Sequence, residues 1–461
     1  MHVRVRGLRS VATLLLAAPL LGGLGCSQSA PDRPNVLLIT LDTTRADRLG
    51  CYGNPRDTSP NLDALAADGV RFDRAIATAA LTPVAHASIF TGLLPPNHGV
   101  RVIYAASGYR LPDTVPTLAT VLEKEGWRTG AFLSAFPVSE FYGFDRGFET
   151  FDNGLGHAGE GVLEENETGA WSFDGTDNQR RSDETADAAL AWMKKSDDPF
   201  YAWVHFWDPH DPLLVPPPDV ANRYQPEVAL SRTVGMRALY DAEIHWVDRQ
   251  IGRLVDELRT TGVLDNTIIV VVSDHGEGLG DHDHWYHRIL YQEQIRVPLL
   301  MRFPQGARGK VVPEVVRTTD IFPTVLAALG LEPEGALDGS PLHGLMAGVS
   351  EEPRLAYAEA LIKYDLNAKD LLAKRPQDDV LHCLTDGKWK LIHRPLRPSE
   401  SELYNLERDA RETNNVFAAQ PGIVEELLSR IEDLDPFVDG PFGEGDDAEA
   451  IERLRALGYV D

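Results

Sequence analysis

The chain has few cysteines, a deficit of basic residues and no long apolar run beyond its N-terminal end. Three cysteines in 461 residues, with no Cys-x-x-Cys pair, exclude a disulfide framework and a zinc–thiolate site. The 44 basic residues are outnumbered by 70 acidic ones, which gives a formal charge of −26. Nucleic acid is therefore excluded as a partner, because a phosphate backbone needs a basic patch. The missing apolar runs exclude a later membrane-spanning helix.

The N-terminus has the pattern of an export signal. A basic start precedes an apolar run over 11–24, which is too short for a comfortable membrane span. The run ends at Leu24-Gly25-Cys26, which resembles a bacterial lipobox. Residues 1–26 are therefore predicted to be a signal peptide with a lipid on Cys26. We expect an exported periplasmic or cell-envelope lipoprotein that contacts the membrane only through this anchor.

Strand and helix patterns alternate along most of the chain. Helical spacing or helix-end residues mark 117–125, 182–195 and 239–258, and Ser182 is expected to cap the second of these helices. Strands buried on both faces are predicted from apolar runs at 36–41, 130–135, 201–207 and 268–272. This rhythm predicts the α/β class, with a large, mostly parallel sheet and helices on both faces.

A change in composition near 347–353 divides the chain. It separates a catalytic domain at 34–345 from a smaller C-terminal α+β subdomain at 352–435. Within the subdomain, Asp386-Gly387 is a hairpin turn signal between two apolar runs. Residues 436–461 are predicted to be an acidic linker and a terminal helix.

Acids stand at the ends of two predicted strands. Asp42 closes the first strand, and Asp274-His275 closes the last. Because ligand sites in open α/β sheets form at the carboxyl ends of the strands, these residues are expected at one edge. Carboxylate oxygen and imidazole nitrogen suit a divalent cation. The alternative is that each acid only caps a helix or closes a turn.

A hydroxyl is predicted at the start of a helix. Thr82-Pro83 has the form of an N-cap followed by the first helical residue, and Gly92 can end the helix. A hydroxyl there faces free N–H groups that favour an anionic ester, and a nearby cation would make it a nucleophile. The alternative is that Thr82 only caps the helix.

Another strand leads into a cluster of titratable side chains. His205, Asp208 and His210 occur within six residues, in a stretch that two prolines constrain. Single histidines are more often structural, but a cluster at a strand end indicates a site.

Several segments together resemble the sulfatase family of the alkaline phosphatase superfamily. The resemblance covers nearly everything from about 34 to 430. It is carried by residues 35–53, 88–100, 142–152, 199–212, 273–277, 290–300, 320–324 and 402–405.

The resemblance implies roles for particular residues. It implies an alkaline phosphatase-like fold and one or two divalent ions, which would be Ca, Mg, Mn or Zn. Arg101 and Asp208 are expected to contact a small-molecule or glycan ester. The metal ligands would be Asp42, Asp274, His275 and Thr82, and the catalytic residues would be Thr82, His86, His210 and His287.

Departures from the family pattern shape the expected chemistry. Thr82 stands where the family has the Cys or Ser that is oxidised to formylglycine, and threonine cannot become that aldehyde. His86 replaces the motif's arginine, and Thr43 replaces a second acid. We therefore expect a hydrolase that favours phosphoesters or phosphodiesters. The alternatives are a true sulfuric ester hydrolase and an inactive, surface-tethered glycan-binding protein.

Overall fold

The computed structural model describes most of the chain after its N-terminal segment. The described residues are 33–155, 163–165, 171–173, 178–210, 214–224, 232–365, 369–434 and 447–457. The predicted signal peptide and Cys26 lie outside them, so export and lipidation stay predictions. Among the described residues, no helix combines the length and apolar character that crossing a membrane requires.

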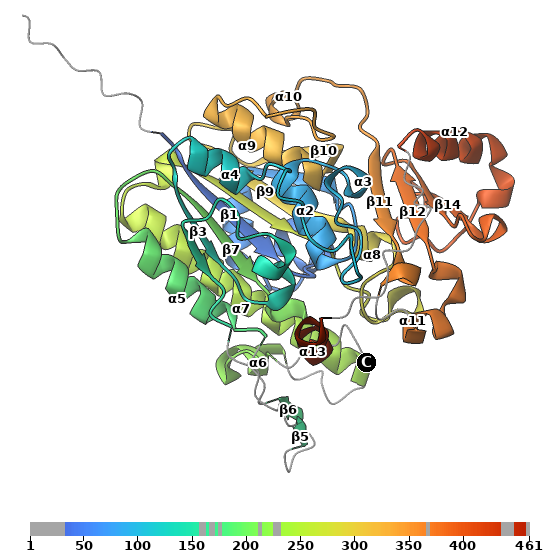
Figure 1. Cartoon of the computed structure of the whole chain (residues 1–461), viewed down its shortest axis with the longest axis horizontal. Helices are drawn as coiled ribbons and strands as arrows, with labels where there is room; N and C mark the ends of the chain where they lie inside the picture. Colours follow the sequence, from blue (N-terminus) through green and yellow to red (C-terminus); the bar gives the residue numbers. More distant parts are fainter. Residues whose placement is uncertain are drawn as a thin grey trace, which may run out of the picture. The chain divides into compact units, whose positions relative to one another are not determined.

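An eight-stranded sheet forms the centre of the fold (Figure 1). Its strand order is β10-β2-β9-β8-β1-β7-β3-β4. Only β9 runs antiparallel to its neighbours, so the sheet is mixed but mostly parallel. The strands are β1 Asn35–Leu41, β2 Val70–Ile76, β3 Arg128–Phe132, β4 Thr150–Asp152, β7 Phe200–Phe206, β8 Thr267–Ser273, β9 Arg296–Arg302 and β10 Lys310–Arg317.

Helices cover both faces of this sheet, as predicted. Successive residues of β1 point to opposite faces. Val36 and Leu38 join a core with α2 (Thr82–Thr91), α4 (Leu118–Lys124) and α9 (Ile321–Leu329). The intervening Leu37 and Ile39 join a second core, which includes α1 (Pro60–Ala67), α5 (Ser182–Met193) and α7 (Arg232–Thr260). The predicted α/β class is therefore confirmed.

A second, antiparallel sheet follows within the predicted C-terminal range. It consists of β11 (Ala356–Ala360), β12 (Leu381–Thr385), β13 (Trp389–His393) and β14 (Glu402–Asn405), in that order. The predicted hairpin joins β12 to β13, and Gly387 adopts φ +87° at its turn. The remaining elements are α3 Pro95–His98, α6 Pro218–Tyr224, α8 Gln292–Ile295, α10 His343–Ala347, α11 Lys369–Lys374, α12 Pro421–Glu432, α13 Ala448–Ala456, β5 Leu163–Glu165 and β6 Trp171–Phe173.

Candidate active site

The acids at the ends of β1 and β8 come together. Leu41 pairs with Ser273 in the parallel register, so the residues that follow, Asp42 and Asp274, leave the sheet side by side. Asp42, Asp274 and His275 each offer a ligand atom, and these atoms lie within 4.8 Å of one another. All three side chains are completely buried. The structure thus forms a compact donor set at the edge of the sheet where the sequence places it.

The backbone after Asp42 is held in an unusual conformation. Thr43 has φ +48°, a region that residues with a side chain seldom occupy. Its N–H donates to Asp274 Oδ1 at 3.2 Å, and its carbonyl accepts from the Tyr240 hydroxyl at 2.6 Å. Tyr240 lies on α7, far away in sequence, and nothing in the local pattern marks it as part of the site. The turn that aims Asp42 therefore depends on a tyrosine that sequence reasoning missed.

Two carboxylate oxygens in the cluster have no hydrogen-bond partner. These are Asp42 Oδ1 and Asp274 Oδ2, both of which are inaccessible to solvent. Burial raises the pKa of both carboxyls well above the usual value. For Asp42 the charge of Asp274 raises it further, while a hydrogen bond with Thr82 acts in the opposite direction. Buried oxygens of this kind, beside an imidazole nitrogen, fit a divalent cation.

His275 presents a fixed nitrogen to this cluster. Its Nδ1 donates to the Gly276 carbonyl at 3.0 Å, so in the neutral ring Nε2 carries the lone pair. Nε2 lies 3.2 Å from Thr82 Oγ1 and 3.4 Å from Asp274 Oδ2. Burial lowers the pKa of His275 well below its usual value, which favours the neutral ring. Nε2 is therefore available to a hydroxyl proton or to a cation.

Gly276 is required for space. A Cβ on Gly276 would lie 2.0 Å from the carbonyl oxygen of Glu293. The φ angle of Gly276 is not positive, so backbone conformation does not require a glycine here. The close approach of another backbone segment, secured by Gly276 N donating to the Gln294 carbonyl at 2.8 Å, thus explains the glycine.

Thr82 starts α2 but does not cap it, contrary to the prediction. Leu81 occupies the N-cap position and Thr82 is the first helical residue. The reason is that the Thr82 hydroxyl is directed to His275 Nε2 and Asp42. Gly92 ends the helix at φ +69°, as predicted.

His86 supports the first turn of α2 from within. Its Nδ1 donates to the Thr82 carbonyl at 2.9 Å and lies 3.5 Å from Asp274 Oδ2. Burial lowers the pKa of His86 to about 4, so the ring is neutral at physiological pH. His86 therefore contacts the backbone of Thr82 and leaves its hydroxyl to other groups.

His205 also joins the cluster. Its Nε2 lies 3.2 Å from Asp42 Oδ2. From the sequence, His205 is grouped with Asp208 and His210 at the end of the third predicted strand, but no role is predicted for it. The signal that reveals it is the register of β1 and β7, in which Thr40 pairs with His205.

Two further predicted histidines lie together beside His275. The rings of His210 and His287 are 5.0 Å apart, and those of His275 and His287 are 4.6 Å apart. His210 stacks on Trp207 at 3.7 Å. The Nδ1 of His287 lies 3.3 Å from Glu277 Oε2, so a buried carboxyl fixes the orientation of this ring. Burial raises the pKa of Glu277 to about 8.

Asp208 hydrogen-bonds with Ser182, at the start of α5. Its oxygens accept from Ser182 N at 3.0 Å and from Ser182 Oγ at 2.9 Å. The predicted cap is therefore wrong by one position, since Arg181 is the N-cap and the Ser182 hydroxyl donates to Asp208. Burial raises the pKa of Asp208 to about 7. Its predicted contact with substrate stays a prediction.

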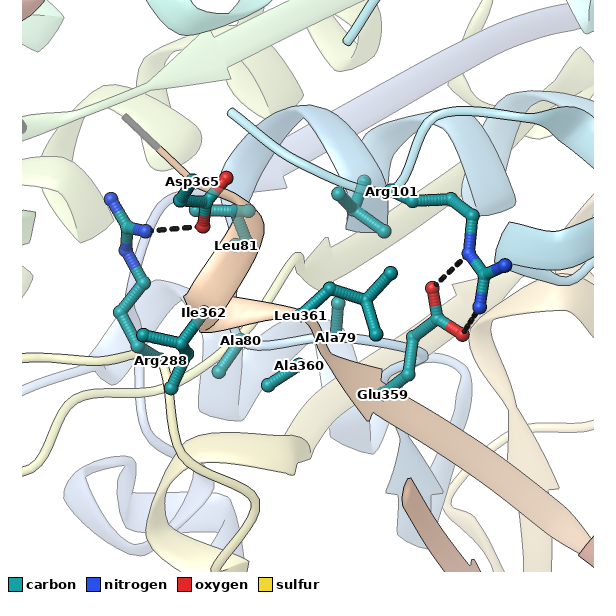
Figure 2. Close-up of a pocket in the computed structure, with 11 residues that line it drawn as sticks. Ala79, Ala80, Leu81, Arg101, Arg288, Glu359, Ala360, Leu361, Ile362 and Asp365 are labelled. Atoms are coloured by element: carbon teal, nitrogen blue, oxygen red, sulfur yellow. Dashed lines mark hydrogen bonds and ion pairs between the residues drawn. The ribbon is translucent and has the colours of Figure 1, made fainter. Parts of the chain in front are cut away.

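Arg101 lies at a small cavity beside the start of α2. Its guanidinium donates to both carboxylate oxygens of Glu359, at 2.7 and 2.5 Å. Leu81 and Arg288 also line this cavity, and Figure 2 shows a second ion pair, between Arg288 and Asp365, on its other side. A substrate role for Arg101 stays a prediction.

Family models, curated proteins and solved structures resemble this chain over most of its length. The family model described as Sulfatase matches residues 34–331, and one described as N-sulphoglucosamine sulphohydrolase, C-terminal, matches residues 280–435. An ulvan-active sulfatase from Formosa agariphila is 27% identical, over 73% of this chain and 68% of its own length. An arylsulfatase from Clostridium perfringens is 26% identical, over 84% and 91%. The solved phosphonate monoester hydrolase of Agrobacterium radiobacter superposes with a TM-score of 0.68 at 26% identity, covering 87% of this chain and 96% of that one.

Proposed function

The chain belongs to the sulfatase family, and from this premise we propose that it is a metal-dependent hydrolase with Thr82 as nucleophile. Its relatives make it a hydrolase of sulfuric or phosphoric esters. We propose further that the preferred substrate is a phosphoester or phosphodiester of a small molecule or glycan. One observation carries the proposal. The Thr82 hydroxyl is directed into the cluster of Asp42, Asp274 and His275.

The donor set is suited to one divalent cation, Mg, Ca, Mn or Zn. Asp42 and Asp274 would hold it through their unpartnered oxygens, and His275 through Nε2, with Thr82 Oγ1 beside them. When bound, such a cation lowers the pKa of a neighbouring hydroxyl and neutralises charge on the ester oxygens. A second ion stays a prediction.

Thr82 then reacts at phosphorus. Its hydroxyl gives its proton to solvent, and its oxygen forms a bond to phosphorus while the bond from phosphorus to the alcohol oxygen breaks, which leaves a phosphothreonine. Water attacks this phosphorus next and gives up a proton, the bond to Thr82 breaks, and the Thr82 oxygen regains a proton. A monoester substrate thereby releases phosphate, and a diester releases a phosphomonoester. His86 holds the first turn of the helix during both steps through its bond to the Thr82 carbonyl.

The leaving alcohol oxygen needs a proton, and His210 and His287 are placed to supply it. Burial lowers the pKa of both rings well below the usual value. An anionic ester that binds between them would raise these pKa values, because a nearby negative charge favours imidazolium. Glu277 fixes Nδ1 of His287, so Nε2 is the nitrogen that faces other groups.

Sulfate esters are the second candidate, favoured by the names of the curated relatives. The chemistry of Thr82 is the reason that we rank sulfate esters below phosphate esters. A formylglycine hydrate releases sulfate by collapse of a hemiacetal, whereas a sulfated threonine has no such route. Its turnover would need direct attack of water at sulfur.

The test compares an aryl phosphate, a bis-aryl phosphate and an aryl sulfate, each with Mg, Ca, Mn or Zn. Thr82→Ala is expected to abolish turnover, and Thr82→Ser, which keeps a hydroxyl, is the matched control. Acid quenching followed by peptide mass spectrometry should find phosphate on Thr82. Full activity of Thr82→Ala would refute the nucleophile, and turnover of the sulfate alone would reverse the ranking. Tight glycan binding without any turnover would support the inactive alternative.

A further inference from the structure

We infer that Asp365, in the C-terminal subdomain, is a positioning residue for His287, acting through Arg288. The inference rests on the proposed function insofar as His287 serves the ester. Asp365 Oδ2 pairs with Arg288 Nη1 at 2.5 Å, and Arg288 directly follows His287 in the chain. The two side chains are 2% and 11% exposed, so the pair is largely shielded from water.

The backbone conformation of Arg288 must be stabilised by contacts with other residues. Its φ of +122° lies in a region that residues with a side chain rarely adopt. Such conformations persist only when the surrounding structure determines them. Gln294 holds the chain before and after Arg288. Its Oε1 accepts from Ile289 N, the next residue, at 2.9 Å, and its Nε2 donates to the carbonyl of Tyr286, two residues before Arg288, at 3.2 Å. The side chain of Arg288 itself is held by Asp365, which pairs with its guanidinium.

Two hydrogen bonds from its own loop also hold His287. Glu277 holds Nδ1 of the ring, and His284 Nε2 donates to the His287 carbonyl at 3.0 Å. Asp365 differs because it belongs to another part of the fold. It follows β11 and the short 3₁₀ helix Ile362–Tyr364. The position of a site histidine is thereby tied to the C-terminal subdomain.

Asp365 also connects to the segment that follows α3. Its Oδ1 accepts from Ile103 N at 2.7 Å, so one carboxylate joins two loops of the catalytic domain. Figure 2 shows Asp365 and Arg288 on one side of the small cavity and Arg101 with Glu359 on the other. In both pairs the arginine comes from the catalytic domain and the carboxylate from the C-terminal subdomain. Only the pair with Arg288 adjoins a histidine of the site.

Asp365→Asn tests the inference with little disturbance. The amide keeps an acceptor for Ile103 N but loses the charge that holds Arg288. With the aryl ester that the wild-type enzyme turns over, we expect kcat to fall about 10–100-fold and KM to change little. In a double-mutant cycle with His287→Ala, Asp365→Asn should lower kcat no further. An equal fall in both backgrounds would overturn the inference.

A second readout does not depend on turnover. Diethyl pyrocarbonate modifies exposed, neutral imidazoles, and peptide mass spectrometry follows each histidine separately. Asp365→Asn is expected to raise the modification rate of His287 several-fold, and an unchanged rate would also overturn the inference. This readout remains decisive if the wild-type protein hydrolyses neither ester, an outcome that counts against the proposed function alone.

Asp320→Asn is the matched control for lost stability. Asp320 is a buried carboxylate that pairs with Arg317 at 2.7 Å and Arg354 at 2.9 Å, and its ion pairs are with these two arginines and not with a residue of the site. Its variant should lower the melting temperature but leave the His287 modification rate at the wild-type value. If Asp320→Asn raises that rate as much as Asp365→Asn, the effect is general loosening and the positioning role fails.

Discussion

Asp274→Asn is expected to make the protein more stable than the wild type without a divalent cation and less stable than the wild type with one. The variant keeps both hydrogen bonds to its Oδ1, from Thr43 N and His275 N, because an amide oxygen accepts as a carboxylate does. What changes is Oδ2, which has no partner and lies beside the Asp42 carboxylate. An amide N–H there can donate to Asp42. Without a cation, the variant should therefore be more stable than the wild-type protein.

The size of the effect follows from the geometry. The donor atoms lie within 4.8 Å of one another, and two unit charges at that limit repel by about 3 kcal/mol at an effective dielectric constant of about 20. Protonation of one carboxyl relieves this repulsion, so the gain from the substitution depends on how far both carboxyls are ionised. With free cation at about 1,000 times its dissociation constant, the wild-type protein gains about 4 kcal/mol. The variant gains little, because it has lost a charged ligand.

Thermal unfolding at pH 8, with a strong chelator and then with excess Mg, Ca, Mn or Zn, measures both limits. A chain of this length shifts by about 1 °C per kcal/mol. We expect Asp274→Asn to melt above the wild-type protein in chelator, by up to about 3 °C, and below it with the preferred cation. Asp320→Asn, as control, should melt lower in both conditions and keep the full response to cation. If Asp274→Asn responds to cation like the wild type, the metal site is refuted.

Three further predictions concern the supports of the site. Tyr240→Phe leaves the Thr43 carbonyl without its buried donor and should cost about 1–3 kcal/mol by chemical denaturation, with weaker cation binding; unchanged cation affinity would contradict this role. Gly276→Ala places a Cβ 2.0 Å from the Glu293 carbonyl oxygen and should cost about 1–3 kcal/mol; a wild-type melting temperature would show that the backbones part freely. Burial raises the pKa of Asp208 to about 7, so the folded state binds its proton more tightly and this stability is lost as pH rises from about 4 through 7. Asp208→Asn should therefore lose less stability than the wild type between pH 5 and 8, and parallel pH profiles would refute the assignment.

The sheet and the acids at its edge were predictable because their signals are local. Apolar runs mark β1 and β8, and in both cases the acid follows the run directly. Parallel strands end at one edge, so Asp42 and Asp274 had to be neighbours if their strands were. The antiparallel direction of β9 had no comparable local signal.

Other contacts depend on how distant segments pack. The role of His205 follows from the register of β7 on β1, and that of Tyr240 from the placement of α7. Local rules also gave way to tertiary contacts. Thr82 and Ser182 have good capping side chains, but each lies one residue inside its helix because its hydroxyl is used by a site residue or a buried carboxylate.

The central position of β1 has a consequence for folding. β1 is the first strand in the chain, yet its partners are β7 and β8, which begin at Phe200 and Thr267. During synthesis, more than half of the chain must emerge before β1 can complete its ladder with β8, which ends at Ser273. Contacts of such long sequence separation form slowly, since loop closure must precede them. Asp42 and Asp274 are therefore expected to come together late on the folding pathway. A cation that binds them would stabilise the folded domain but would not start its folding.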